Sequence, residues 1–234
     1  MRYPALATDY DGTLADRGVV AGSTWVAIER LRATGRRAVL VTGRELEELR
    51  EICPRLDLFD RVVVENGAML YRPGDRTDRL LGAGPPDALV AELIARGVGP
   101  ISAGRVIVAT WEPHREAVEA TIRALGLDLR VIANKRALMI LPPGVDKASG
   151  LAEALGELGL SPAGAVGVGD AENDAALLGA CGLGVAVANA LPWLKERADL
   201  VTLGERGEGV VELIGRILAG TLPPPLAHRK KGPG

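Results

Sequence analysis

The chain has 234 residues, 47% of them hydrophobic, and its 28 basic and 30 acidic side chains leave a formal net charge of −2. A charge so close to zero provides no long-range field for nucleic acid or an anionic membrane, so we expect neither partner. Two cysteines and two histidines are too few for a metal centre built on those ligands, and no apolar run spans a bilayer or resembles a signal peptide, so we expect a cytoplasmic protein.

Two carboxylates stand at the end of the first predicted strand. The apolar residues 5–7 lead into Asp9 and Asp11, and Gly12 then ends the strand. In an open α/β sheet, ligands bind at this carboxyl end of the strands. Because two acids so close together repel each other, we expect a hard divalent cation to be shared between them.

Helices and apolar strands alternate in the first third of the chain. The expected elements are a helix over 22–35, a strand over 37–41, a helix over 45–53 and a strand over 61–65. Thr42, Gly43 and Arg44 follow the second strand, and the pair Asn66-Gly67 after the third is typical of a tight turn. This alternation of helices with nearly continuous apolar strands predicts an α/β fold, with a mostly parallel sheet and helices on both faces.

The pattern changes in the middle of the chain. Residues 73–86 are charged and rich in Gly and Pro, which indicates a linker. The elements expected beyond it are helices over 87–96 and 114–125, a strand over 105–111, and hairpin strands over 129–134 and 137–142. We therefore expect a core of residues 1–71 and 144–222, interrupted by a small α+β unit of residues 72–143.

The alternation resumes after residue 144. The expected elements are a helix that Lys147 opens, a strand over 165–169, a helix beginning at 172–174, a strand over 184–188, a short helix with Leu191 and Leu194, a strand at 200–201 and a helix over 209–219. Residues 223–234 are Pro-rich and then basic, which predicts a disordered tail.

Reactive side chains recur just after predicted strands or at predicted helix starts. They are Asp9, Asp11, Thr42, Lys147, Asp170 and Asp174. If the strands are parallel, these side chains meet at one edge of the sheet. An acid cluster for a metal, a hydroxyl and an ammonium are the groups needed to bind and transfer a phosphoryl group.

Four short segments in order carry a resemblance to a known family. DYDGT at 9–13, VTGR at 41–44, GVDK at 144–147 and GDAEND at 169–174 resemble the motifs of haloacid dehalogenase superfamily phosphatases. ENGA at 65–68, VAVANA at 185–190 and ADLVT at 198–202 resemble its Cof-type branch. The resemblance implies a Rossmann-like core with a cap inserted between the second and third motifs. It also implies a magnesium-dependent phosphoric monoester hydrolase of the phosphoglycolate or sugar-phosphate class.

The resemblance also implies a role for each motif residue. Asp9 would be the nucleophile that forms an aspartyl-phosphate, and Asp11 would carry the proton. Thr42 and Lys147 would bind phosphoryl oxygens. The implied ligands of Mg²⁺ are the Asp9 carboxylate, the Asp11 backbone carbonyl, Asp170 and Asp174.

Substrate contacts are expected at the edge of the site and in the cap. The expected contacts are Gly43, Arg44, Asn66, Asn173 and Arg136, the last from a basic pair with Lys135 that would hold a carboxylate or a second phosphate. A phosphomutase using the same two aspartates, or a phosphatase-like module that acts by binding, remains open as an alternative. We expect a small-molecule substrate and a monomer or homodimer.

Overall fold

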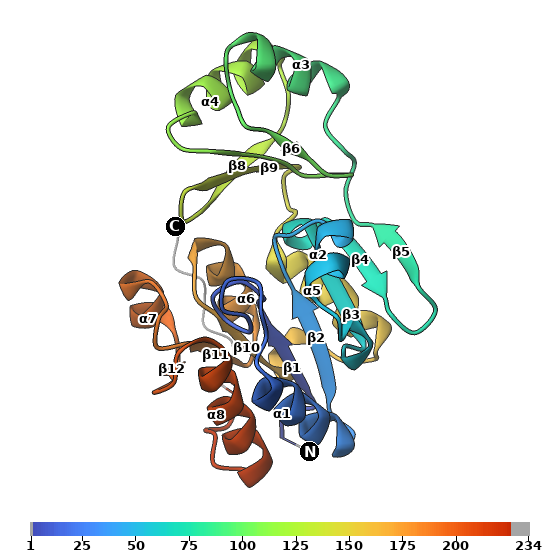
Figure 1. Cartoon of the computed structure of the whole chain (residues 1–234), viewed down its shortest axis with the longest axis vertical. Coiled ribbons are helices and arrows are strands. Elements are labelled where there is room, and N and C mark those ends of the chain that lie inside the picture. Colours follow the sequence, from blue (N-terminus) through green and yellow to red (C-terminus); the bar gives the residue numbers. More distant parts are fainter. Residues whose placement is uncertain (1, 226–234) are drawn as a thin grey trace.

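The computed structural model describes residues 2–225, which form a larger unit with a smaller one above it (Figure 1). The larger unit contains an eight-stranded sheet of order β12-β11-β10-β1-β2-β3-β4-β5. Its strands are β1 (Ala5–Thr8), β2 (Arg37–Val41), β3 (Arg61–Val64), β4 (Met69–Arg72), β5 (Thr77–Leu80), β10 (Ala165–Gly169), β11 (Leu183–Ala186) and β12 (Leu200–Val201).

The smaller unit contains a four-stranded antiparallel sheet of order β6-β7-β9-β8. Its strands are β6 (Ser102–Ala103), β7 (Val108–Trp111), β8 (Arg130–Asn134) and β9 (Ala137–Leu141). The helices of the described residues are α1 (Gly22–Ala33), α2 (Leu46–Ile52), α3 (Asp87–Ala95), α4 (Arg115–Ala124), α5 (Lys147–Glu157), α6 (Ala175–Ala180), α7 (Pro192–Arg197) and α8 (Arg206–Ala219), with 3₁₀ turns η1 (Leu56–Leu58), η2 (Glu65–Gly67), η3 (Pro162–Gly164) and η4 (Glu172–Asp174).

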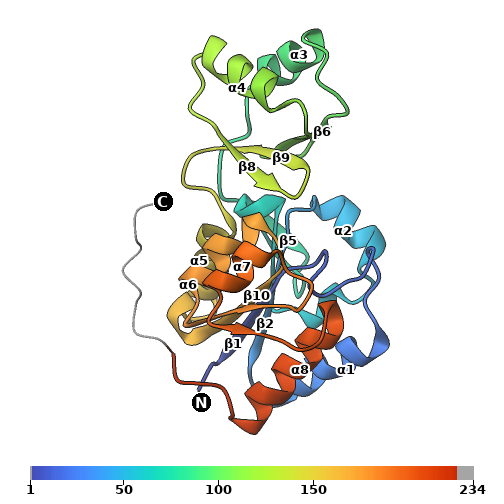
Figure 2. The ribbon, with the colours of Figure 1, turned by 90° about the vertical axis from the view of Figure 1, so that its left-hand side faces the viewer.

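The predicted mostly parallel sheet is confirmed. Strands β12 to β3 pair in parallel, and β1 lies in the middle between β10 and β2. Helices α1 and α8 pack together on one face, and α5 and α6 pack on the other (Figure 2). Strand β1 is buried along its whole length, which is why its sequence is continuously apolar before it reaches the acids.

The segment expected as a linker, residues 73–86, contains a strand of the large sheet. Strand β4 turns back antiparallel on β3, and β5 pairs antiparallel with β4 at the edge of the large sheet. Residue 72, where we expected the insert to begin, therefore pairs with Thr77 inside the large sheet. All four residues of β5 are exposed, and the first three are polar or charged. No hydrophobic pattern in the sequence therefore marked β5 as a strand.

The sheet of the smaller unit lies between its two helices and the larger unit (Figures 1 and 2). Alternate residues of one strand serve its two faces: Ile140 packs with Leu89 and Val118 of α3 and α4, whereas Met139 packs with Ile107 in a separate cluster. One face of this sheet thus packs against the two helices of the smaller unit, and the other face is turned toward the larger unit. We call residues 81–143 the cap from here on.

The two ends of the described chain meet beneath the sheet. The Tyr3 hydroxyl donates to the carbonyl of Pro223 at 2.7 Å, and an Arg2 guanidinium nitrogen donates to the carbonyl of Leu222 at 2.9 Å. The start of the predicted tail is therefore hydrogen-bonded to the core at Pro223, whereas residues 226–234 of that prediction lie outside the described residues. Within residues 2–225, no helix has both the length and the apolar character needed to cross a membrane.

The last residue of α5 fastens this helix to the antiparallel edge of the sheet. Glu157 Oε2 accepts hydrogen bonds from Arg61 Nε of β3 at 2.8 Å and from Arg72 Nε of β4 at 2.9 Å. The hydrogen bond from Arg72, with that from Arg61, lowers the pKa of Glu157 to about 2. A depressed pKa means that this contact stabilises the fold above the ordinary glutamate pKa and loses its effect as the pH falls toward 2.

We therefore expect Glu157→Gln to lower the free energy of unfolding at pH 7 by about 1 kcal/mol, because solvent screens ion pairs at the surface. The difference from the wild type should shrink as the pH is lowered from 5 to 2. Denaturant unfolding at several pH values measures it, with Glu153→Gln, whose carboxylate pairs with one arginine, Arg79, among the described residues, as the matched control. A difference that stays constant with pH would contradict this account.

Candidate active site

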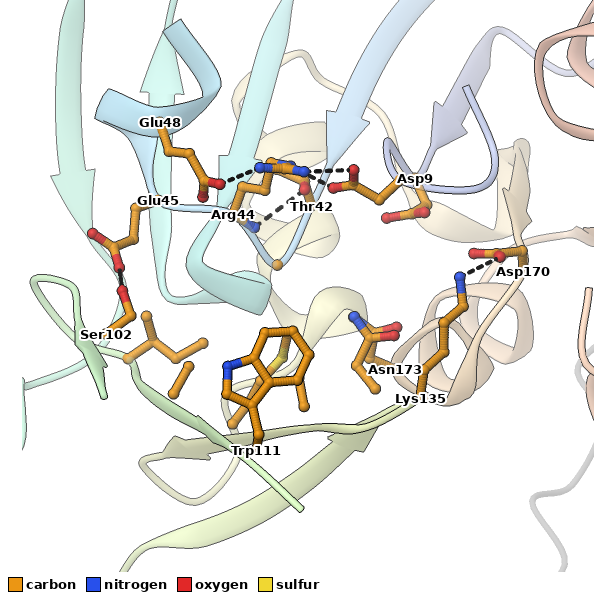
Figure 3. A pocket seen from close by; sticks show the side chains of 17 residues that line it. Asp9, Thr42, Arg44, Glu45, Glu48, Ser102, Trp111, Lys135, Asp170 and Asn173 are labelled. Carbon is orange, nitrogen blue, oxygen red and sulfur yellow. Dashed lines mark hydrogen bonds and ion pairs between the residues drawn. The ribbon is translucent and has the colours of Figure 1, made fainter. Parts of the chain in front are cut away.

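Three predicted site residues lie side by side because three parallel strands end at the same level. Thr8 pairs with Val168 on one side and Leu40 on the other, so Asp9, Thr42 and Asp170 follow at the same edge of the sheet. Figure 3 shows these three side chains around one cavity. The predicted convergence of the first, second and fourth motifs is observed here.

A buried cluster of charges forms the floor of this site. Asp9, Asp170 and Asp174 are each at most 5% exposed, and they offer carboxylate oxygens that all lie within 4.8 Å of one another. The ammonium of Lys147, itself 1% exposed, donates to Asp9 Oδ1 and to Asp174 Oδ1, both at 2.6 Å. The other Asp174 oxygen accepts the backbone N–H groups of Asp170 and Ala171 at 2.9 and 3.0 Å, which fixes the loop after β10.

The start of helix α5 places Lys147 beneath the ends of the parallel strands. Asp146 caps α5 by accepting the backbone N–H of Ser149 at 2.8 Å, and the Asp146 N–H donates back to the Ser149 hydroxyl. Lys147 is then the first residue of the helix, where a cation opposes the helix dipole. The two carboxylates that it contacts offset this unfavourable placement.

The electrostatics of the cluster favour an additional cation. Burial raises the pKa of Asp9, and the charges of Asp174 and Asp170 raise it further against the opposing effect of Lys147. Burial also raises the pKa of Asp170. Burial alone would lower the pKa of Lys147, but the carboxylates of Asp174 and Asp9 outweigh it, so that this pKa is raised. Three buried carboxylates against one buried ammonium thus leave a surplus of negative charge.

The donor set fits Mg²⁺. Hard divalent cations prefer oxygen ligands, and a cluster of three carboxylates with surplus negative charge supplies them from Asp9, Asp170 and Asp174. The carboxylate of Asp11 is not part of this cluster. The contribution expected from Asp11, through its backbone carbonyl, stays a prediction.

Asp11 is instead held by Arg44 at the opening of the cavity. Arg44 donates from Nε to Asp11 Oδ2 at 2.5 Å and from a terminal nitrogen to Oδ1 at 2.8 Å, and it also pairs with Glu48. Arg44 had been expected to contact substrate, but its guanidinium is engaged by these two acids. It therefore positions the carboxylate that is expected to carry the proton.

A second group of predicted residues surrounds the space above the cluster. Asn173 and Gly43 line the cavity, whereas Asn66 is fully buried and lies outside its lining. The Asn66 side-chain carbonyl accepts the amide N–H of Asn173 at 3.0 Å, and the Asn66 backbone N–H donates to the carbonyl of Thr42 at 2.9 Å. Asn66 therefore acts on the site through Asn173 and Thr42.

The cavity lies between the core and the cap and has a volume of about 320 Å³. Its cap wall is largely apolar, with Ile107, Trp111 and Met139 among the lining residues. Trp111 is half-exposed and turned toward the cavity (Figure 3). The side chain of Met139 packs so close to Gly43 that a Cβ at position 43 would lie 2.7 Å from the methionine Cε.

The cap hairpin brings Lys135 into the site, and not Arg136. The turn between β8 and β9 is confirmed at residues 135 and 136, since Asn134 pairs with Ala137. Lys135 donates from Nζ to Asp170 Oδ2 at 2.9 Å, while Arg136 is exposed and is not a lining residue of the cavity. Neighbouring side chains of a two-residue turn diverge, and the sequence held no signal for which of them would face the site.

Glu65 is a functional residue that the sequence reasoning missed. Its carboxylate, on a residue 1% exposed, accepts the backbone N–H groups of Arg105, Val106 and Ile107 at 3.0, 2.7 and 2.9 Å. A core side chain thereby holds the strand that enters the cap sheet. The Glu-Asn-Gly string was expected to form a tight turn and was part of the resemblance to the Cof-type branch, with no role given to Glu65; the acid that directly follows a buried strand was the available signal.

The turn carrying Glu65 also sets the position of α5. Gly67 has φ +108°, and a Cβ there would lie 1.9 Å from the carbonyl oxygen of Asp146. We expect Gly67→Ala to lower the free energy of unfolding by about 3 kcal/mol, since backbone strain and a backbone clash add. Chemical denaturation measures it. The control is Gly156→Ala in α5, where an added Cβ would meet open space, so this variant should be as stable as the wild type or more stable. Equal stability of the two variants would refute the packing argument.

Comparisons with known proteins agree with this geometry. The family model described as haloacid dehalogenase-like hydrolase matches residues 6–80 and 105–214. A phosphoglycolate phosphatase of Aeropyrum pernix is 30% identical over 227 residues, covering 93% of this chain and 95% of that protein. A phosphoglycolate phosphatase of Haloarcula marismortui is 33% identical over 222 residues, covering 90% of this chain and 96% of that protein.

The fold is shared with solved structures. A haloacid dehalogenase-like hydrolase from Bacteroides thetaiotaomicron superposes with a TM-score of 0.78 at 21% identity, covering 92% of this chain and 99% of that chain. The family match spans the four motifs whose acids and lysine meet in the site. This chain therefore belongs to the haloacid dehalogenase-like hydrolases, as a phosphatase of that superfamily.

Proposed function

We propose that the protein hydrolyses a small phosphomonoester through an aspartyl-phosphate on Asp9, with Mg²⁺ bound in the acidic cluster. The observation that carries the proposal is the buried contact of Asp9 with Lys147, beside two further carboxylates and beneath a small cavity. A carboxylate so placed can attack phosphorus while the surrounding cations offset its repulsion from the phosphate.

In the first step Asp9 attacks the phosphorus atom. Lys147 engages Asp9 Oδ1, and its charge opposes the rise of the Asp9 pKa that burial causes. Among the described residues Oδ2 accepts no hydrogen bond, so it can form the new bond to phosphorus. The bond between phosphorus and the ester oxygen breaks with both electrons passing to that oxygen. Asp11 accepts from two Arg44 nitrogens in this structure, and in its protonated form, released from Arg44, it would give that oxygen a proton.

In the second step water attacks the phosphorus of the aspartyl-phosphate. Asp11 accepts the proton from this water, the bond to Asp9 breaks, and inorganic phosphate leaves. Thr42, Gly43 and Asn173 line the space where the phosphoryl oxygens would lie, and the hydroxyl, backbone N–H and amide of these residues are the donors available to them. Mg²⁺, when bound, would supply positive charge to those oxygens.

The cavity and the relatives support a small substrate. A volume of about 320 Å³ is at the lower end for ligand pockets and leaves little space beyond a phosphoryl group and a short leaving group. The relatives from Aeropyrum pernix and Haloarcula marismortui are named phosphoglycolate phosphatases. We infer a substrate of the phosphoglycolate or sugar-phosphate class.

Replacing the nucleophile tests the reaction route. Asp9→Asn keeps the size of the side chain but removes its negative charge, so we expect turnover to fall by about 10⁴-fold with the fold retained. Phosphate release measures turnover, and circular dichroism checks the fold. Asp57→Asn, at an exposed aspartate of the core, should behave as the wild type. Substantial turnover by Asp9→Asn would eliminate the assigned nucleophile.

Removing the metal tests the cluster. We expect EDTA to abolish turnover and Mg²⁺ to restore it, because the surplus negative charge otherwise repels the phosphate. In Asp170→Asn, which lacks one of the three clustered carboxylates, the Mg²⁺ concentration for half-maximal activity should rise by about 10-fold or more. Phosphate release during Mg²⁺ titration measures both effects. Full activity in EDTA would contradict the metal requirement.

A further inference from the structure

The cap reaches the candidate metal site through the turn that carries Lys135. Lys135 lies in the β8–β9 turn with φ +56°, and its backbone N–H donates to Glu172 Oε2 at 2.7 Å. Its ammonium donates to Asp170 Oδ2 at 2.9 Å. The turn thus contacts, at two points, the short core segment that follows β10 and contributes two of the clustered carboxylates (Figure 3).

Of the two cationic side chains that line the cavity, Lys135 pairs with fewer acids. Of the residues that line the cavity, only Arg44 and Lys135 carry positive charge, against five acids: Asp9, Asp11, Glu45, Glu48 and Asp170. Arg44 is held by two of these acids, Asp11 and Glu48. The side chain of Lys135 is half-exposed, and its charged partner is Asp170, a member of the cluster that fits Mg²⁺.

Metal binding would therefore change the partner of Lys135. An Asp170 carboxylate that is shared with a divalent cation is a weaker acceptor for the ammonium, and the two cations repel each other. Lys135 would then be displaced from Asp170 while its turn stays anchored to Glu172. The half-exposed ammonium, once released from Asp170, is then able to pair with another anion that enters the cavity.

The rest of the cap wall argues against a polyol as the leaving group. Beside Lys135, this wall is mostly apolar, with Ile107, Ala109, Trp111, Ala137 and Met139, and Asn134 adds a single side-chain amide, which is little hydrogen bonding for several hydroxyl groups. The cap residue Ser102 lines it too, but its hydroxyl already donates to Glu45. The wall is thus suited to a short leaving group with one negative charge.

We propose that Lys135 determines substrate specificity by binding an anionic group on the leaving group of the substrate. A carboxylate is the simplest such group. This inference rests on the proposed phosphatase reaction and narrows its substrate class. Lys135 contacts Asp170 in this structure, and with Mg²⁺ bound it would contact the substrate's anion instead.

The test compares two esters that differ mainly in one charge. The wild type, Lys135→Met and Lys135→Arg are assayed with phosphoglycolate and with ethyl phosphate, which lacks the carboxylate. We expect Lys135→Met to lower kcat/KM for phosphoglycolate by at least about 10-fold, mainly through KM, and to change that for ethyl phosphate by less than about 3-fold. Lys135→Arg should recover much of the loss.

Two further variants locate the effect. Arg130→Met removes an exposed cation at the other end of strand β8 and is the matched control. Arg136→Met tests the neighbouring cation: if the selective loss appears there and not in Lys135→Met, the assignment is overturned. It is also overturned if Lys135→Met lowers kcat/KM equally for both esters, as a structural role would, or for neither.

A measurement without substrate tests the metal-free contact. Because the ammonium occupies the Asp170 carboxylate, Lys135→Met should bind Mg²⁺ several-fold more tightly than the wild type in calorimetric titration. Unchanged or weaker binding would refute the displacement. Hydrolysis of ethyl phosphate by the wild type reports on the proposed function separately, so that its failure is distinguished from a failure of this inference.

Discussion

The buried contact of Lys147 with Asp9 and Asp174 is the interaction on which the site depends. Burying one ammonium and several carboxylates is costly unless each is paired, and here one cation serves the acids after β1 and β10 at once. Its position is fixed from two sides, by the cap of α5 and by the close packing of Gly67 against Asp146. The surplus charge that remains is what makes the cluster suited to a metal.

The cap is fastened to this core by polar contacts at opposite sides of the cavity. Glu65 holds the backbone of residues 105–107, and Glu172 with Asp170 holds the turn at Lys135. The first contact is buried and joins a side chain to backbone, whereas the second is half-exposed and depends on charge. A firm attachment near the entry of the cap and a charge-dependent one at its tip would let the tip respond to what the cavity contains.

Much of the core and of the site was predictable, for an identifiable reason. Strands buried on both faces are continuously apolar, so the polar residue that follows each predicted core strand is easy to identify in the sequence. Parallel pairing of these strands then requires Asp9, Thr42 and Asp170 to meet. Strand β5 escaped prediction because an edge strand is held by its backbone and is free to be polar. The role of Arg44 escaped because its partner Asp11 is 33 residues away in sequence.

The sequence by itself determined the fold class, the order of the motifs and the acids and lysine of the catalytic edge, since these follow from local periodicity and from the common direction of the strands. Only the tertiary structure decided which side chains complete the site from elsewhere. Whether Lys135 or Arg136 reaches the cavity, and that Glu65 holds the cap, depend on how the cap is docked over the core. Such docking is set by the packing of surfaces distant in sequence, which leaves no periodic signal along the chain.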